Sequence, residues 1–281
     1  MDRSPPKIFN AKARALAKTR AAKRQARKGL SFLLQRVGED AASRVEDINR
    51  QFTRAALICA ADMRPVIASN LRTERVPTEF QHIETAADLR GEYDLILSLF
   101  ELQSDDAIPE TLMRCRKHLA PDGLLLIGFL GGDTLTELRQ SLYAADQQIL
   151  GGATARIFPM VDYSQAAMLL GRVGLALPVV DMDRLTVHYS KLSSLVSDLR
   201  DLGLTNTLAA RETRPLPRRW REALQASYKT HFARGDGKLK ASFEIVWMTG
   251  WAPHGSQQKP LKPGSAKMRL ADALKTKETK I

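Results

Sequence analysis

Short apolar runs alternate with amphipathic stretches along this sequence, and this alternation limits its fold more than any other feature. Residues 55–61, 80–83, 93–99 and 124–129 are apolar runs of strand length. The stretches that separate them carry apolar residues at helical spacing. Strands that alternate with helices predict a mostly parallel sheet covered by crossover helices, the α/β layered architecture.

Local signals set the ends of several helices. Pro65 suits the first turn of a helix, Gly174 suits the end of one, and Thr134 with Glu137 has the spacing of a capping box. The predicted helices are 30–49, 63–71, 107–119, 134–148, 162–173, 192–202 and 218–232, and the remaining predicted strands are 177–182, 185–189 and 242–248.

The positive charge lies at the two ends of the chain. Residues 1–28 carry ten Lys or Arg and one acid, residues 259–281 carry seven and two, and the net charge of +12 therefore leaves −2 for the residues between them. We predict a basic helical extension over 1–50, an α/β domain over 51–252, and a Pro/Gly loop with a basic tail over 253–281. Nucleic-acid binders more often carry cations on the folded surface. Basic ends suit an acidic protein partner, an anionic membrane surface or solvent.

Composition excludes several other classes of protein. No apolar run approaches the roughly 20 residues that span a bilayer. Cys59 and Cys115 are the only cysteines, and the five histidines show no metal-ligand spacing. We therefore predict no metal site and a reducing compartment.

Three segments carry a resemblance to a known family. They read LAPDG at 119–123 with GGDTLTELR at 131–139, RIFP at 156–159 with DRLTV at 183–187, and GWAPH at 250–254 followed by SQQKP and PGSA. Together they resemble the class I methyltransferase-like family of respiratory complex I assembly factors, which includes a mitochondrial arginine hydroxylase and its proteobacterial relatives.

This resemblance implies the seven-stranded, Rossmann-like sheet of S-adenosylmethionine (SAM) methyltransferases. It also implies SAM as the cofactor, a complex I subunit as the protein partner, and a role in assembly or subunit modification of NADH:quinone oxidoreductase. Members are usually described as methyltransferases, whereas the mitochondrial relative is credited with hydroxylating an arginine, so the reaction stays open. The family-like sequence begins by Ile8. This leaves no room for a removable leader, and we expect a bacterial cytoplasmic protein, with peripheral membrane contact as one use of its basic ends.

The turn after the first strand departs from the family pattern, which is acid-x-Gly-x-Gly-x-Gly. Leu57 stands at the acid, and Cys59, Ala61 and Met63 stand at the glycines. No glycine occurs anywhere in residues 39–90. Glycines are needed in this turn because backbone N–H groups must approach the cofactor closely. The sequence therefore predicts a degenerate SAM-binding motif.

The first half of the domain is also short. Only 37 residues separate Leu57 from Asp94, and with about 30 residues or more for a βαβ unit, roughly one unit is missing. The acid that binds the ribose hydroxyls would belong to that unit, and the nearby substitutes are Asp62 and Glu84. The family's Leu-His-Trp after the next strand is replaced by Leu102-Gln103-Ser104.

Two groups of candidate site residues follow, and no catalytic residue can be named. The cofactor-binding candidates are Asp62, Asp94, Leu102, Gly131 and Gly132.

The substrate- or partner-binding candidates are Asp133, Arg139, Arg156, Trp251 and His254. The simpler interpretation is that Asp133 caps a helix and that both arginines are surface residues.

Three functions stay open at this stage. The leading hypothesis is a methyltransferase-like protein that assists complex I assembly by binding a subunit. The first alternative is a working SAM-dependent methyltransferase with an atypical pocket. The second is a nucleic-acid-associated protein that uses its basic ends.

Overall fold

A computed structural model describes residues 7–77 and 79–258. The helices in this part of the chain are α1 (Ala11–Lys28), α2 (Phe32–Glu46), α3 (Arg64–Asn70), α4 (Ile108–Lys117), α5 (Thr136–Leu150), α6 (Tyr163–Arg172), α7 (Leu192–Asp201) and α8 (Arg218–Phe232), with the short 3-10 turns η1 (Ala86–Asp88) and η2 (Leu102–Ser104). Among the described residues, no helix is both long and apolar enough to cross a membrane.

The strands form one sheet in the order β2-β1-β3-β4-β6-β5. Their bounds are β1 (Ala55–Ile58), β2 (Phe80–Ile83), β3 (Tyr93–Leu99), β4 (Leu119–Leu130), β5 (Ala176–Tyr189) and β6 (Leu239–Trp251). Strands β2, β1, β3 and β4 pair in parallel, and β6 is antiparallel to both β4 and β5. The prediction of a mostly parallel α/β sheet is confirmed.

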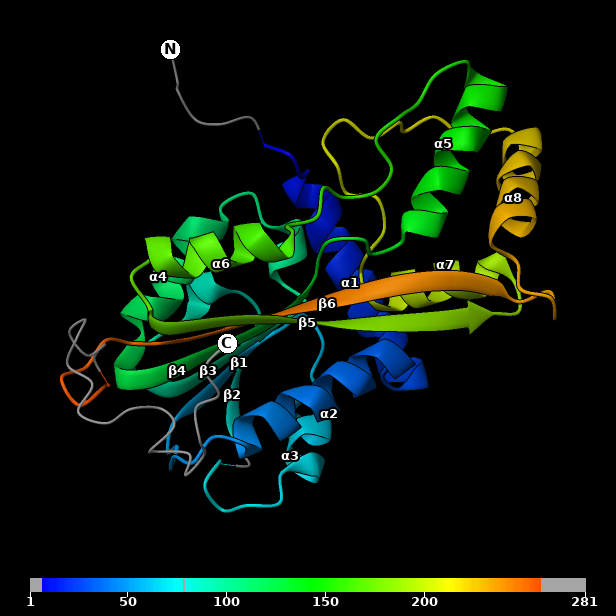
Figure 1. Ribbon diagram of the computed structural model, residues 1–281. Coiled ribbons are helices and arrows are strands. Elements are labelled where there is room, and N and C mark those ends of the chain that lie inside the picture. Colours follow the sequence, from blue (N-terminus) through cyan, green and yellow to red (C-terminus); the bar gives the residue numbers. More distant parts are fainter. Residues whose placement is uncertain (1–6, 78, 259–281) are drawn as a thin grey trace, which may run out of the picture.

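Helices cover both faces of this sheet because successive side chains of a buried strand point to opposite sides. Leu97 of β3 belongs to the core under α2 and α3, together with Val37. Its neighbour Ile96 belongs to the core under α4 and α6, together with Leu170. Helices α1, α5, α7 and α8 gather on the right of Figure 1, beyond the end of β4.

The N-terminal half of the sheet is shortened, as predicted. A single strand, β2, lies between β1 and β3 in the sequence, and residues 84–92 connect β2 to β3 with only the turn η1. Strand β2 is therefore the outermost strand on this side of the sheet in the described part of the chain.

The predicted capping box at the start of α5 is wrong. Thr134 is buried, and its hydroxyl donates to the carbonyl of Glu244 (3.2 Å) and accepts from the Glu244 N–H (2.9 Å). The Glu137 carboxylate accepts from the N–H (3.0 Å) and hydroxyl (2.7 Å) of Ser242. Both polar groups bind β6 instead of capping α5, which begins at Thr136.

The two strands predicted on either side of Asp183 form one continuous strand, β5. Asp183 stays in register opposite Ile245 of β6. Because β5 is an edge strand, its outward residues tolerate charge, and the break in apolar residues did not mark a turn. Strand β1 ends at Ile58, three residues earlier than predicted.

The basic N-terminal extension is helical and docked on the domain. The side chain of Asn10 caps α1 by accepting the N–H of Ala13 (2.9 Å), and the buried residues of the helix are the small Ala17 and Ala21. The basic tail over 259–281 lies outside the described residues.

Candidate functional site

Parallel α/β sheets bind ligands beyond the carboxyl ends of strands, at the point where the strand order reverses. In this sheet the chain passes from β1 outward to β2 and then returns to β3 on the other side of β1. The residues that follow β1, β2 and β3 are called the β1–β3 edge below.

Side chains fill the turn after β1. Cys59, Ala61 and Met63, which stand at the family's glycine positions, are at most 5% exposed. Burial raises the pKa of the Cys59 thiol to about 12, so this thiol is neutral and a poor nucleophile. Asp62 bonds to the side chain (2.8 Å) and backbone (3.2 Å) of Arg64, and the Arg64 guanidinium lowers the pKa of the Asp62 carboxyl. The Asp62 carboxylate is therefore occupied by Arg64, the first residue of α3.

Helix α1 crosses the same edge. Lys18 pairs with Glu101, the second residue after β3, and Arg14 donates to the carbonyl of Ser104. Burial raises the pKa of the Glu101 carboxyl, and the nearby Lys18 charge offsets only part of that effect. The ion pair ties α1 to the end of β3.

Two hollows remain beside α1, of about 390 Å³ and about 200 Å³. Glu84 follows β2 directly, is exposed, and lines the larger hollow with Ala60. The residues of this edge do not fit SAM through a glycine-rich turn. Side chains occupy the positions where backbone N–H groups would meet the cofactor, and Lys18 and Glu101 bridge the edge.

The other predicted cofactor residues are not brought together here. Asp94 lies at the amino end of β3, where its carboxylate accepts from Thr53 N–H (2.6 Å) and Arg54 N–H (2.9 Å). It thus faces the opposite edge of the sheet. The side chain of Leu102 is 2% exposed and packs in the core with Ile96.

The glycines after β4 serve close packing against other parts of the domain. A Cβ on Gly131 would lie 2.6 Å from the carbonyl oxygen of Val161, and one on Gly132 would lie 1.9 Å from the Glu244 carboxylate. Gly132 also has a positive φ of 48°. Both glycines are explained by this turn without a ligand.

The C-terminal half contains a buried charged cluster around Asp146, which is 1% exposed. Its carboxylate accepts from Arg156 (2.8 Å), Thr154 (2.7 Å) and the indole N–H of Trp220 (2.7 Å). The Arg156 guanidinium also lies over the Trp220 ring, 4.7 Å from its centroid. Burial alone would raise the pKa of Asp146, but these hydrogen bonds outweigh it and lower the pKa.

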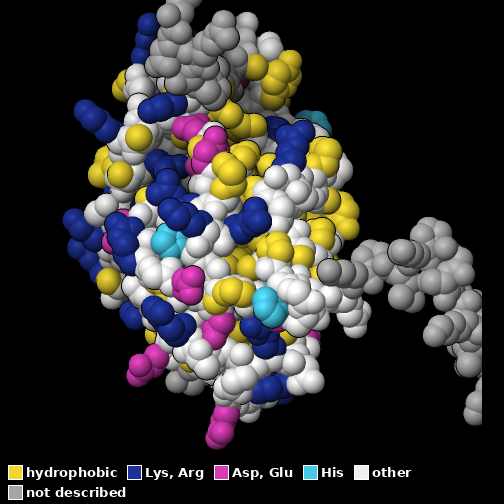
Figure 2. Space-filling model, turned by 90° about the vertical axis from the view of Figure 1, so that its left-hand side faces the viewer, with side chains coloured by type: hydrophobic (Ala, Val, Ile, Leu, Met, Phe, Trp, Pro, Cys, Tyr) yellow, Lys and Arg dark blue, Asp and Glu magenta, His cyan; other side chains and the backbone are white. Residues whose placement is uncertain are grey.

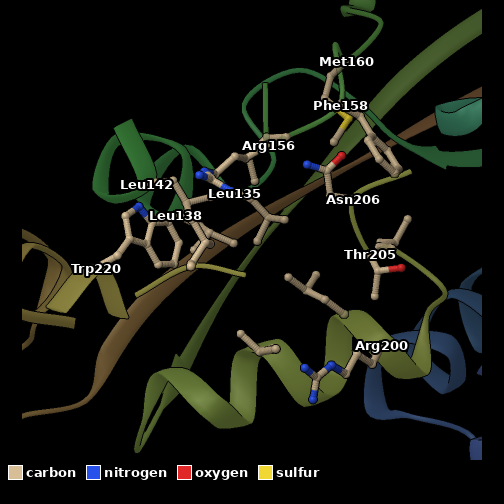
Figure 3. Close-up of a pocket in the computed structure, with 15 residues that line it drawn as sticks. Leu135, Leu138, Leu142, Arg156, Phe158, Met160, Arg200, Thr205, Asn206 and Trp220 are labelled. Atoms are coloured by element: carbon tan, nitrogen blue, oxygen red, sulfur yellow. The ribbon is translucent and has the colours of Figure 1, made fainter. Parts of the chain in front are cut away.

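This cluster lines an apolar cavity of about 400 Å³ between α5, α7, α8 and the loops before α6 and after α7. Figure 3 shows Trp220 and the leucines of α5 along one side and α7 along another. We call this space the C-terminal cavity. Cavities of this size and apolar character are the usual binding sites for small ligands or inserted side chains.

Asp133 and Arg139 lie outside this cavity. The side chain of Asp133 is exposed, does not cap α5, and lies 3.8 Å from Arg184. Arg139 is exposed on α5, next to a shallow hollow that Ile8 also lines. Of the predicted partner-binding residues, Arg156 alone contributes to the cavity wall.

Trp251 and His254 lie at the other end of the sheet. Trp251 pairs with Leu124 in the first half of β4, and the Arg50 guanidinium lies 5.5 Å from the Trp251 ring centroid. His254 is exposed and bonds to Ser256 (2.7 Å). The structure therefore separates these two residues from Arg156.

Sequence reasoning missed Asp146, Trp220 and Glu244. Asp146 and Trp220 lie 74 residues apart in two helices, and no local pattern links them. Glu244 had a usable signal, since it is the one charged residue in the apolar stretch 243–248 of β6. Within residues 7–77 and 79–258, no group of three or more His, Cys, Asp or Glu side chains is placed to hold a metal ion.

Comparison with known proteins identifies relatives over most of the chain. No family model matches it. The chain is 32% identical to the mitochondrial arginine-hydroxylase NDUFAF5 of Danio rerio over 87% of this chain and 82% of that protein. It is 36% identical to the malonyl-[acyl-carrier protein] O-methyltransferase of Xylella fastidiosa over 57% of this chain and 52% of that enzyme.

A solved structure, the YcgJ protein of Bacillus subtilis, matches 78% of this chain and all of its own with a TM-score of 0.45 and 12% identity. The fold itself follows from the chain's own topology, a six-stranded, mostly parallel sheet between helices. This arrangement agrees with the class I methyltransferase-like fold expected from the sequence. Given the extent of the match to the Danio rerio protein, the chain belongs to the family of the arginine-hydroxylase NDUFAF5.

Proposed function

We propose that this protein assists the assembly of NADH:quinone oxidoreductase (complex I) by binding one of its subunits, without SAM chemistry. Membership in the NDUFAF5 family, at 32% identity over more than four fifths of both chains, is the observation that carries the proposal. The relative's name describes an arginine hydroxylase, so an arginine-containing segment is the subunit region that we expect to be bound.

The difference between the β1–β3 edge and the C-terminal cavity supports a binding role. The β1–β3 edge is filled by Cys59, Ala61 and Met63 and bridged by the pair of Lys18 with Glu101. The C-terminal half keeps a cavity of about 400 Å³. A protein that has lost its cofactor turn but kept this cavity is suited to binding without methyl transfer.

We place this role in the cytoplasm, next to the membrane. Cys59 and Cys115 are free thiols, which agrees with a reducing compartment. On the face at the left of Figure 1, Lys and Arg side chains are interspersed with acidic and apolar ones (Figure 2). The relatives do not favour a nucleic-acid-binding role.

Deleting the gene tests the proposal directly. We expect the NADH:quinone oxidoreductase activity of membranes to fall, with incomplete complex on native gels, and the wild-type gene to restore both. Glu84→Ala should restore them equally well, because this exposed residue has no role in a protein that does not use SAM. A deletion strain with normal complex would contradict the proposal.

A working SAM-dependent methyltransferase is the second candidate, and Glu84 is the observation that favours it. An acid directly after the second strand is suitably placed to bind ribose hydroxyls, and Glu84 lines a hollow of about 390 Å³. If Glu84→Ala fails to rescue while remaining folded and abundant, this second candidate replaces the first.

A further inference from the structure

Two hollows of different character adjoin at the end of α7. One is the apolar C-terminal cavity, and the other is a cleft of about 280 Å³ between α1 and α7. Arg200 and Thr205 line both. A ligand could therefore occupy the two together.

The cavity has a largely apolar wall, and Arg200, which it shares with the cleft, is the one cation in its lining without an ion pair among the described residues. Leu138 and Leu142 of α5, with Leu199 of α7, form much of the lining. Arg156 also lines it, but its charge is balanced by Asp146, with an N–O distance of 2.8 Å. This part of the site suits an apolar group.

The cleft is strongly cationic. Its walls carry Arg20, Lys23, Arg24 and Arg27 of α1 together with Arg200 of α7.

Only one of these five cations is neutralised in the described part of the chain. Arg24 pairs with Asp201, and the other four make no ion pair there. Like charges spaced three and four residues apart on a helix repel one another and destabilise it. An anion bound among them would remove that penalty.

The packing of α1 on α7 holds the two hollows together. Ala21 and Gly203 allow a close approach, since a Cβ on Gly203 would lie 3.6 Å from that of Ala21. Gln25 donates to the Asp201 carbonyl (2.6 Å), and Arg24 bonds to Ser197 (2.8 Å). The α1 cations are thus fixed relative to the mouth of the cavity. Figure 3 shows α1, in blue, passing beside the end of α7 that carries Arg200.

We propose that the cavity and the cleft form one binding site for an amphiphilic anion of the fatty-acid type. Its acyl chain lies in the C-terminal cavity, and its carboxylate binds among Arg20, Lys23, Arg27 and Arg200. The acyl chain fills the same C-terminal cavity that supports the proposed subunit binding, so ligand and subunit would compete for it. The titrations below contain no subunit, so their outcome does not rest on the proposed function.

Calorimetric titration of the full chain with three monomeric probes tests the proposal. Dodecanoate has both the chain and the charge, dodecanol has the chain alone, and butyrate has the charge alone. Dodecanoate should bind with micromolar affinity, at least tenfold tighter than either control. It should also change the fluorescence of Trp220, which lines the cavity. Equal binding of dodecanol and dodecanoate would overturn the proposal.

Variants separate the two halves of the site. The double variant Arg27→Gln/Arg200→Gln should weaken dodecanoate about five- to tenfold, the size expected from two exposed charge pairs, and leave dodecanol unchanged. Val196→Phe, in the cavity wall, should weaken both probes.

Arg221→Gln/Lys229→Gln is the matched control, because it removes two exposed cations of α8 away from the cleft. If it weakens dodecanoate as much as the cleft variant does, the attraction is non-specific and the proposal fails. Binding to anionic vesicles but not to monomeric dodecanoate would also overturn it, in favour of a membrane-surface role.

Discussion

Two largely buried carboxylates, one in each half of the molecule, have pKa values shifted in opposite directions. Glu101 at the β1–β3 edge has Lys18 as its charged partner, and its pKa is raised. Asp146 in the C-terminal half accepts from Arg156, Thr154 and Trp220, and its pKa is lowered. Burial disfavours both ions. At Asp146 the hydrogen bonds outweigh this effect, whereas at Glu101 the Lys18 charge and hydrogen bond offset only part of it.

The two carboxylates thus belong to different kinds of structure, an ion pair that bridges the β1–β3 edge and a hydrogen-bond network that lines a cavity. The pair of Lys18 and Glu101 ties α1 over a turn that has no glycine. The network of Asp146 holds Arg156 and Trp220 in fixed positions on a cavity wall. The C-terminal half therefore has the better prepared binding site, although the family's fold suggests a cofactor at the other edge.

The largest effect is expected at Asp146. Asp146→Ala leaves Arg156 buried without its partner and Trp220 without its acceptor, so the free energy of unfolding should fall by about 3–5 kcal/mol. Urea denaturation measures it.

Asp133→Ala is the matched control, since this aspartate follows the same strand as α5 but is exposed. Its effect should stay within about 0.5 kcal/mol. A loss at Asp146 no larger than at Asp133 would show that the network does not stabilise the C-terminal half.

The next largest loss of stability is expected in the turn after β4, and the turn after β1 should lose less. Gly132→Ala places a Cβ against the Glu244 carboxylate in a backbone with positive φ, and should lower the free energy of unfolding by about 2 kcal/mol or more. Gly152→Ala, which meets nothing within 4 Å, is the control. Ala61→Gly in the β1 turn should lose only about 1 kcal/mol, from added chain entropy. Equal losses at Gly132 and Gly152 would contradict the tight packing of the β4 turn.

A smaller, pH-dependent effect distinguishes the two carboxylates. In the folded state the pKa of Glu101 is above its usual 4.5, so as the pH falls the folded state takes up this proton before the unfolded state does. The wild-type protein should therefore gain stability relative to Glu101→Gln as the pH falls from 7 towards 4.5. The contribution of Asp146 to stability changes with pH in the opposite direction, because its folded pKa is lowered. Its stabilisation is present above the usual pKa of 3.8 and is lost as the pH falls through its lower folded pKa. Denaturation midpoints from pH 7 to 4.5 measure the Glu101 effect, and midpoints below pH 3.8 measure the Asp146 effect. The same slope in wild type and Glu101→Gln would contradict the raised pKa.

The last prediction concerns the reactivity of the Cys59 thiol and not the stability of the fold. With a thiol pKa of about 12 and 1% exposure, Cys59 should resist iodoacetamide at pH 8 in the native protein and react after denaturation. Mass spectrometry after brief labelling measures this. Rapid labelling of native Cys59 would show that the turn after β1 opens, contrary to the burial of this thiol.

Much of the fold could be predicted because strands and helices leave local patterns. The apolar run at 93–99 is strand β3 as predicted, and the short distance to β1 correctly indicated a missing unit. The capping box failed because Thr134 and Glu137 found better partners on β6, more than 100 residues away. The closure of the β1–β3 edge by α1 was also invisible, since that helix docks through alanines and ion pairs and has no apolar stripe.

Long-range pairs limit what could be predicted of the site. Arg156 was singled out from its motif, but its partner Asp146 and the stacked Trp220 were not. A cluster whose members come from separate helices leaves no spacing in the sequence that a local rule could detect.

Calorimetric titration with SAM tests the central claim, that the β1–β3 edge no longer holds the cofactor. The purified full chain would be titrated next to a family member that keeps all three glycines. We predict no heat of binding for this chain and clear binding by the relative. Micromolar binding by this chain, about −8 kcal/mol, would contradict the loss of cofactor binding at this edge and make SAM-dependent methyl transfer the leading function.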